Sequence, residues 1–362
     1  MPLKKLLLKS GVNRENTRYT SEGGWYECDK IRFRQGTPEK IGGWQRISAT
    51  TFQGVCRSLW NWVTLGSQNL IAVGTNLKYY IENGGAYNDI TPLRATVTLT
   101  NPFETVSGSP IVTVTDANGG YTDGDFVTYS GASAVGGLTL NGEYQITLTT
   151  TTNEYTIDAG SAASSAATGG GTVTAAYQIN VGTAFVIPLT GWGAGSWSSG
   201  TWGVGVTSTE SIRLWSESNF GEDLVFGPRG GPIYYWDATN GLASRGVALS
   251  TLGGASNVPT NQRLIEVSDI NRFVFAFGAN EFGSATVNPM LVRWSDQGSV
   301  VDWTPSVTSQ AGFLTLSNGT EIIAAKQARQ EVLVWTDAAL YSLQYVGAPV
   351  VWSAQLVGEN IS

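Results

Sequence analysis

The side chains that most often carry catalysis are scarce in this sequence of 362 residues. It contains no histidine, which excludes Ser–His and Cys–His nucleophile pairs, histidine metal sites and the commonest general base. Its two cysteines, Cys28 and Cys56, are too few for a structural zinc site. In the oxygen-rich stretch DANGGYTDGD, residues 116–125, Gly120 occupies a ligand position of an EF-hand-like pattern, which favours a turn over a calcium loop. We expect no metal and no cofactor.

Two close carboxylate pairs remain as candidates for acid–base chemistry, Asp123 with Asp125 and Glu222 with Asp223. A glycosidase places such a pair on either side of the bond that it cleaves. Both pairs fall on expected turns, and no diagnostic residues surround them. The glycine pairs do not follow a strand and open a helix, as a phosphate or dinucleotide site requires. The sequence therefore predicts a protein that is not an enzyme.

The composition indicates strands and tight turns as the elements that position these residues. Charged residues make up only 14%, the chain has 45 Gly and 13 Trp, and Thr, Ser, Val and Tyr are concentrated in its middle. No window has the apolar spacing of an amphipathic helix, and no apolar stretch is long enough to span a membrane. We predict an all-β fold, free cysteines and no membrane insertion.

Four segments share one plan, an apolar strand followed by a turn and an aromatic-rich strand. They begin at residues 70 (LIAVGTNLKYYIE), 224 (LVFGPRGGPIYYWD), 273 (FVFAFG, then MLVRWSD) and 332 (VLVWTDAALYSLQ). Further strands precede several of them, so each unit has three to four antiparallel strands, which predicts β-propeller blades. The steps of 49 and 59 residues between the last three segments are typical of blades. Unrelated hairpins of a β-sandwich are the alternative.

The motif Asp-x-Thr-Pro occurs twice, in YNDITP (residues 87–92) and in VVDWTP (residues 300–305). Each copy follows a blade-like run, and a proline suits the end of an outer edge strand, where its missing N–H breaks no ladder. We expect each copy to end one blade.

An insertion separates the first two blade-like segments, because their step of 154 residues is far longer than the others. Short strands alternate with Asn-Gly, Gly-Gly and Asp-Gly turns, which predicts a small β-barrel or sandwich. The order GDFVTYSG, LNGEYQI, EYTI resembles a β-module inserted in phage virion proteins. The expected organisation is a basic arm with the start of the propeller (1–50), a first blade (51–94), the inserted module (95–178), a Trp/Gly-rich connector (179–210) and further blades (211–362).

Charge divides the chain into a basic arm and an acidic body. Residues 1–46 hold 10 Lys and Arg against 5 Asp and Glu, a net charge of +5, and the remainder holds 11 against 23, a net charge of −12. One interpretation is that these acidic residues lie on solvated loops of a β-domain. The other is that they keep the body from attracting the phosphate backbone of DNA.

The connector contains GWGAGSWSSGTWGVG at residues 191–205, in which Trp192, Trp197 and Trp202 each lie between small residues. Such tryptophans stack on sugars in lectins, or pack over neighbouring glycine-rich backbone. Both interpretations stay open.

The N-terminal run GVNRENTRYTSEGGWYECDKIRFRQGTPEKIGGWQRI, residues 11–47, resembles the start of tail proteins from short-tailed bacteriophages (podoviruses). The chain looks like a tail nozzle, or tail tubular protein B, and like the related tail hub, or packaged-DNA stabilisation protein. The resemblance implies a structural ring, usually a homohexamer, below the adaptor ring that joins the portal to the tail. It implies a conduit for genome retention and ejection, assembled in the host cytoplasm and located in the virion tail.

For this role, we expect the basic arm to dock on the adaptor or a neighbouring subunit through Lys4, Lys5, Arg14, Arg18, Trp25, Lys30, Arg32 and Arg34. A peripheral strand of the first blade is the alternative for this arm. Tail fibres are a further expected partner, and viral DNA would pass the acidic body without specific binding.

Four blade-like units do not close a propeller, so either the sequence is C-terminally incomplete or a partner supplies the missing wall. The alternative function is a carbohydrate-binding or receptor-binding tail propeller that uses the connector tryptophans.

Overall fold

The computed structural model describes residues 9–15, 17–20, 23–43, 46, 48–117, 120–185 and 212–360. Within these ranges the regular elements are antiparallel strands and two 3-10 turns, η1 (Ala238–Asn240) and η2 (Leu249–Thr251), without an α-helix. The all-β prediction is therefore confirmed. No helix in the described part has the length and apolarity to cross a membrane. The chain divides into two compact units, Met1–Ala49 and Thr50–Ser362.

The N-terminal unit is built around a hairpin of β1 (Ile31–Arg34) and β2 (Thr37–Lys40). Gln35 and Gly36 form its two-residue turn with φ of 49° and 81°, the conformation that matches the twist of a tight hairpin. The two strands form a sheet of their own. β1 and β2 are therefore not strands of the sheet formed by residues 56–89.

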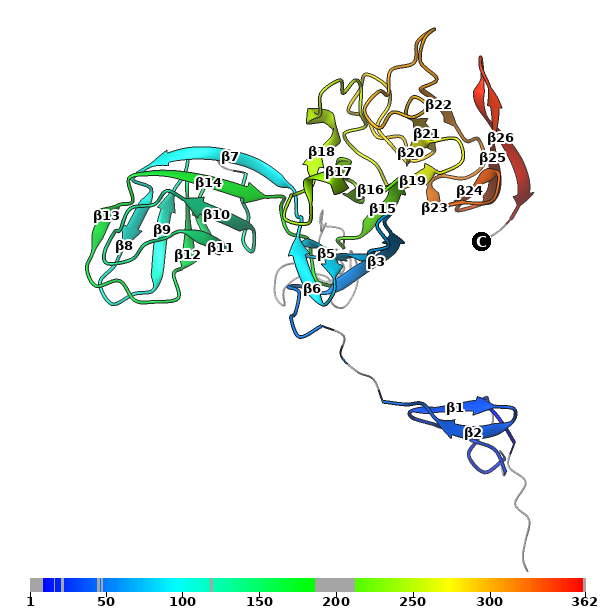
Figure 1. Ribbon diagram of the computed structural model, residues 1–362, viewed down its shortest axis with the longest axis horizontal. Coiled ribbons are helices and arrows are strands. Elements are labelled where there is room, and N and C mark those ends of the chain that lie inside the picture. The colour runs from blue at the N-terminus through cyan, green and yellow to red at the C-terminus, as the bar shows by residue number, and fades with distance from the viewer. Residues whose placement is uncertain are drawn as a thin grey trace, which may run out of the picture. The chain divides into compact units, whose positions relative to one another are not determined.

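Four four-stranded antiparallel sheets form the predicted propeller blades (Figure 1). Blade 1 contains β3 (Cys56–Val63), β4 (Asn69–Thr75), β5 (Tyr79–Asn83) and β6 (Ala86–Asp89). Blade 2 contains β15 (Trp215–Phe220), β16 (Asp223–Pro228), β17 (Tyr234–Trp236) and β18 (Val247–Ala248). Blade 3 contains β19 (Leu264–Ser268), β20 (Phe273–Phe277), β21 (Leu291–Trp294) and β22 (Gly312–Thr315). Blade 4 contains β23 (Ile322–Gln327), β24 (Glu331–Thr336), β25 (Ala339–Gly347) and β26 (Val351–Glu359).

Sequence and structure agree on which strands correspond between blades. The segments aligned at residues 70, 224, 273 and 332 are the second strands β4, β16, β20 and β24. The first strands lie side by side, β3 with β15, β15 with β19 and β19 with β23, so the four blades follow an arc in Figure 1.

Each pair of neighbouring blades shares an apolar core. Blades 1 and 2 enclose Trp62, Tyr79, Phe226 and Trp236. A second core between blades 2 and 3 includes Val225, Ile265, Val274 and Trp303, and a third between blades 3 and 4 includes Phe275, Trp294, Val334 and Trp352. Alternation along each strand directs one set of side chains to each neighbour, and this burial holds the arc together.

The inserted module is one eight-stranded sheet in the order β13-β8-β9-β12-β11-β10-β14-β7. Its strands are β7 (Leu93–Thr100), β8 (Phe103–Thr105), β9 (Ile111–Thr115), β10 (Phe126–Ser130), β11 (Gly142–Thr151), β12 (Glu154–Asp158), β13 (Ala167–Gly169) and β14 (Thr172–Gln178). Strands from both ends of this order bury side chains in one core, which confirms the predicted small β-module. The chain enters and leaves it side by side, since the Ile179 N–H donates to the Pro92 carbonyl at 3.0 Å.

The two Asp-x-Thr-Pro copies do not occupy equivalent places. Asp89 ends β6, as predicted, but Asp302 lies between β21 and β22, so the expectation that the second copy ends a blade is wrong. The local structure is shared: Asp89 accepts the Thr91 N–H at 2.9 Å, and Asp302 accepts the Thr304 N–H at 3.0 Å. The motif encodes an Asx turn, which the chain uses at different points of a blade.

Candidate functional site

The predicted docking residues lie in the N-terminal unit, except that Lys4 and Lys5 fall outside the described residues. Arg14, Arg18, Lys30, Arg32 and Arg34 are all exposed. The guanidinium groups of Arg14 and Arg18 lie over the Tyr26 ring, 5.6 and 5.0 Å from its centroid. These stacking contacts and surface ion pairs leave most of each cation open to a partner.

Trp25 has a different environment from these cations. Its ring is half-buried and meets the Phe33 ring edge to face at a centroid distance of 6.1 Å. Its backbone carbonyl accepts the Asn13 N–H at 2.9 Å. Trp25 therefore packs inside the N-terminal unit, and its role in docking stays a prediction. Trp192, Trp197 and Trp202 lie outside the described residues.

The carboxylates singled out in the sequence accept hydrogen bonds from backbone N–H groups. Asp125 is buried and accepts the Thr122 N–H at 2.9 Å. Asp223 accepts the Ala238 N–H at 2.9 Å. Their neighbours Asp123 and Glu222 accept the backbone N–H groups of Thr149 and Leu65. Such bonds satisfy backbone N–H groups, which in a folded protein need partners.

A charged cluster that the sequence did not predict lies where the inserted module meets blades 1 and 2. We name it the junction cluster, and its members are Lys78, Asp89, Glu143, Gln178 and Arg245. The Lys78 ammonium contacts Glu143 of the module and lies 3.1 Å from Asp89 Oδ2 of blade 1. Arg245, which precedes β18 of blade 2, lies 3.4 Å from the same Asp89 oxygen, and Gln178 Nε2 donates to Glu143 at 2.6 Å.

Lys78, the most buried charged member of the junction cluster, depends on its ion pairs. The Lys78 side chain is only 4% exposed, so its charge requires the two carboxylates. Burial by itself would raise the pKa of Asp89, but Arg245, Lys78 and the hydrogen bonds from Thr91 outweigh it and lower that pKa. The cluster therefore fastens the inserted module to the blades and holds Asp89 ionised.

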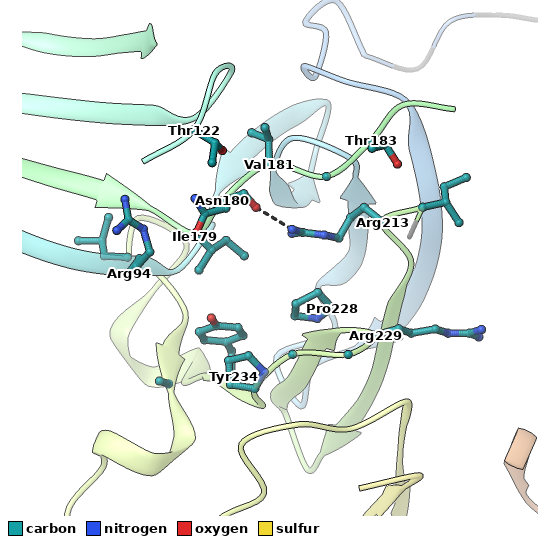
Figure 2. Close-up of a pocket in the computed structure, with 17 residues that line it drawn as sticks. Arg94, Thr122, Ile179, Asn180, Val181, Thr183, Arg213, Pro228, Arg229 and Tyr234 are labelled. Atoms are coloured by element: carbon teal, nitrogen blue, oxygen red, sulfur yellow. Dashed lines mark hydrogen bonds between the residues drawn. The ribbon is translucent and has the colours of Figure 1, made fainter. Parts of the chain in front are cut away.

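A cavity of about 540 Å³ opens beside this junction (Figure 2). Much of its wall is formed by residues 179–183, which leave the module, and by residues 228–232, which run from the end of β16 toward β17. Arg94, Arg213 and Arg229 line it, whereas none of its lining residues is acidic. Arg213 donates to the Asn180 carbonyl at 2.7 Å, while Figure 2 shows Arg229 directed away from the other two arginines. The three cations do not converge on one point, so they do not form a single anion site.

The first strands of the blades carry a second charged group. Lys326 of β23 lies 3.2 Å from Glu266 of β19 and also over the Trp60 ring of β3, 4.6 Å from its centroid. Glu217 of β15 is half-buried beside the hydroxyls of Ser58 and Tyr79, and the loss of solvent around its carboxylate raises the pKa of Glu217 to about 7. Its Oε2 has no hydrogen-bond partner in the described structure.

Glu217 and Glu266 are not arranged as an acid–base pair. Glu217 lies opposite Phe226, whose ring belongs to the core between blades 1 and 2. Glu266 lies opposite Phe275, in the core between blades 3 and 4, and is paired with Lys326. The two carboxylates thus face different neighbours. Among the described residues, no three His, Cys, Asp or Glu side chains are grouped to hold a metal ion.

Comparisons with known proteins identify no family for this chain. No protein-family model matches the chain, and no curated protein matches it. One solved structure that matches is the phage phi92 endosialidase, with a TM-score of 0.23 and 12% sequence identity. The match covers 83% of this chain and 42% of that protein. A likeness at this level assigns neither a fold nor an activity to the chain.

Proposed function

We propose that the chain is a structural protein of a short phage tail, a nozzle or hub subunit that forms part of the conduit for genome retention and ejection. The observation that supports this best is the architecture: a basic N-terminal unit, an arc of propeller blades and a β-module inserted after the first blade. It is the organisation expected from the resemblance of residues 11–47 to podovirus tail proteins.

The role is assembly without catalysis. Asp125 holds a turn, Asp89 belongs to the junction cluster, and Glu266 pairs with Lys326 between blades. The exposed cations of the N-terminal unit suit docking on the adaptor ring or a neighbouring copy, with tail fibres as a further partner. The acidic remainder, with a net charge of −12, suits passage of DNA, because it releases no counterions from phosphates. We infer a homohexamer that is assembled in the host cytoplasm and resides in the virion tail.

Quantitative peptide mass spectrometry of purified virions tests this proposal. A ring of six beside a portal of twelve would give about half the portal's copy number. Absence from virions would overturn the proposal. Deletion of residues 1–20 should block tail assembly while the rest of the chain stays folded, and normal tails from this deletion would exclude the docking role.

The second candidate is a carbohydrate-binding or receptor-binding tail propeller, which the Gly-flanked Trp192, Trp197 and Trp202 favour. Glycan-array binding that disappears when these residues are changed to Ala would support it. Failure of tail assembly with unchanged glycan binding would support the nozzle.

A further inference from the structure

The first strand of each blade contributes one side chain to a group that we name the central group. Its members are Trp60 of β3, Glu217 of β15, Glu266 of β19 and Lys326 of β23. The Lys326 ammonium lies 3.2 and 3.4 Å from the two carboxylate oxygens of Glu266, and 4.6 Å from the centroid of the Trp60 ring. One cation of blade 4 therefore contacts blades 3 and 1 at once, and its charge also acts on Glu217 of blade 2.

Glu217 is the member of the central group whose surroundings oppose a charge. It is half-buried, and its Oε2 atom has no hydrogen-bond partner among the described residues. On the side of blade 1 it lies beside the Ser58 hydroxyl and the fully buried Tyr79. An ionised carboxylate loses hydration in such surroundings, which favours the protonated form. This loss of solvent raises the pKa of Glu217 to about 7, so its charge changes near neutral pH.

Two weak acids and two cations face Glu217 from the elements packed around it. The acids are the Tyr79 hydroxyl and the Cys56 thiol of blade 1, and burial followed by the charge of Glu217 raises the pKa of each. The cations are Arg229, directly after β16 of the same blade, and Lys326 of blade 4. Both cations lower the pKa of Glu217 against the larger effect of the lost solvent. Of the two, Lys326 is the one already paired with another carboxylate.

Lys326 is able to change its partner, whereas Glu266 is fixed in place. The Lys326 side chain is 54% exposed, but the Glu266 side chain is only 7% exposed and also accepts a backbone N–H of β23 at 3.2 Å. A lysine carries its ammonium on a flexible four-carbon stem, so a half-exposed lysine moves without opening a core. A new negative charge on Glu217 therefore acts on a cation that is free to respond to it.

We propose that the central group is a pH-sensitive switch, in which Lys326 pairs with Glu266 while Glu217 is protonated and shifts toward Glu217 when that carboxylate ionises. Raising the pH releases one proton from Glu217 to solvent and leaves two carboxylates for one ammonium, which then lies between them. The shift adds a charge contact between blades 4 and 2 to the existing contact between blades 4 and 3. Because only blade residues take part, the inference does not rest on the tail role, and detection in virions has no bearing on it.

Fluorine NMR of the full chain labelled with 5-fluorotryptophan tests the switch through Trp60. The Trp60 ring lies beside the Lys326 ammonium, and its indole N–H donates to Asn219, which is two residues from Glu217 on the same face of β15. The Trp60 resonance is identified as the one that disappears in Trp60→Phe. In a titration from about pH 5.5 to about pH 8.5 it should shift with a midpoint near pH 7, because the cation over the ring moves.

Variants of the charged positions separate the parts of the switch, with circular dichroism to show that each is folded like the wild type. Glu217→Gln should abolish the shift of the Trp60 resonance. Lys326→Met should remove most of its amplitude, whereas Arg229→Gln, the matched loss of the other cation, should keep the amplitude and move the midpoint to higher pH. Glu266→Gln should move the midpoint to lower pH, since Lys326 then has Glu217 as its carboxylate. A Trp60 resonance that does not titrate, that titrates unchanged in Glu217→Gln, or that keeps its full amplitude in Lys326→Met would each overturn the switch.

Discussion

The inserted module keeps its apolar core within one eight-stranded sheet, whereas each blade shares its core with the next blade. The module is therefore complete by itself and joins the rest through its two chain connections and a charged junction. A blade is complete only when it has neighbours on both faces. This difference predicts that the two regions respond separately to mutation, and that changes in one blade interface spread along the arc.

The chemistry of the two kinds of core differs as well. In the module the hydroxyls of Tyr129, Tyr155 and Tyr177 form a chain, with 2.5 Å between the first two and 2.7 Å between the last two. Tyr177 donates to Asp116 Oδ2 at 2.6 Å, and burial raises the pKa of Tyr155 and Tyr177 above the usual tyrosine range. In the core between blades 3 and 4, Phe275 meets Trp352 edge to face at a centroid distance of 4.9 Å. Satisfied polar networks specify one arrangement, while aromatic packing supplies most of the burial.

The largest effect should come from Phe275→Ala in the core between blades 3 and 4. Phe275 is fully buried and also stacks on Phe277, so its removal leaves a cavity and should lower the free energy of unfolding by about 3–5 kcal/mol. Urea unfolding followed by tryptophan fluorescence reports the blades and not the inserted module, since residues 93–178 contain no tryptophan whereas each blade contains at least one. Hydrogen exchange of the module should stay unchanged, and equal loss of protection there would contradict its independence.

A smaller effect, dependent on pH, should come from Glu217 between blades 1 and 2. Its pKa is raised to about 7 in the folded state from 4.5 in the unfolded chain. The folded state therefore binds more protons between these values, and the free energy of unfolding falls as pH rises through this window. The fall attributable to Glu217 should approach roughly 3 kcal/mol.

Glu217→Gln is the comparison that isolates this contribution, because the amide stays neutral at every pH. The variant should be about as stable as the wild type near pH 4.5 and more stable above pH 7.5. Urea unfolding at these two pH values gives the difference directly. Parallel pH profiles of the two proteins would show that the buried carboxylate has no raised pKa.

The local pattern of apolar residues predicted the blades well, because the strands of each blade follow one another within a short stretch of the sequence. The alternating apolar residues that begin at 70, 224, 273 and 332 are the second strands of the four blades, and the composition change after Pro92 marks the inserted module. The junction cluster could not be predicted in this way. Lys78 and Glu143 are 65 positions apart, and only the folded arrangement of the module on blade 1 brings them together.

The Asp-x-Thr-Pro motif shows the other limit of sequence reasoning. Its four residues determine the turn in which Asp89 and Asp302 accept the N–H two positions later. They do not determine where in a blade that turn is placed. In blade 3 the motif lies within the long connection between β21 and β22. In blade 1 the motif begins at Asp89, the last residue of the outer strand β6.

Tyr177→Phe should destabilise the inserted module and leave the blades unchanged, which is the reverse of the effect expected for Phe275→Ala. It removes the hydroxyl that donates to the buried Asp116 and bonds Tyr155, so the module should lose about 1–3 kcal/mol while the blades keep their stability. Hydrogen exchange of β9, β12 and β14 against the blade strands measures the contrast. Tyr121→Phe is the control, since that hydroxyl donates only to the backbone carbonyls of Asp116 and Thr152, and a larger loss there would contradict the network.

The smallest expected effect concerns the connection between the two regions. Glu143→Gln removes the module's charge from the junction cluster, but Lys78 keeps Asp89 as a partner at 3.1 Å, so the loss should be about 1 kcal/mol and not the larger cost of an unpaired buried cation. It should appear as faster hydrogen exchange at residues 89–93 and 178–181, because the charge pair no longer restrains these two connections. Asp89→Asn should cost more, since Lys78 and Arg245 both contact that carboxylate. If Glu143→Gln instead destabilised the cores of the module and the blades equally, they would form one cooperative unit, and the separation inferred from their cores would be wrong.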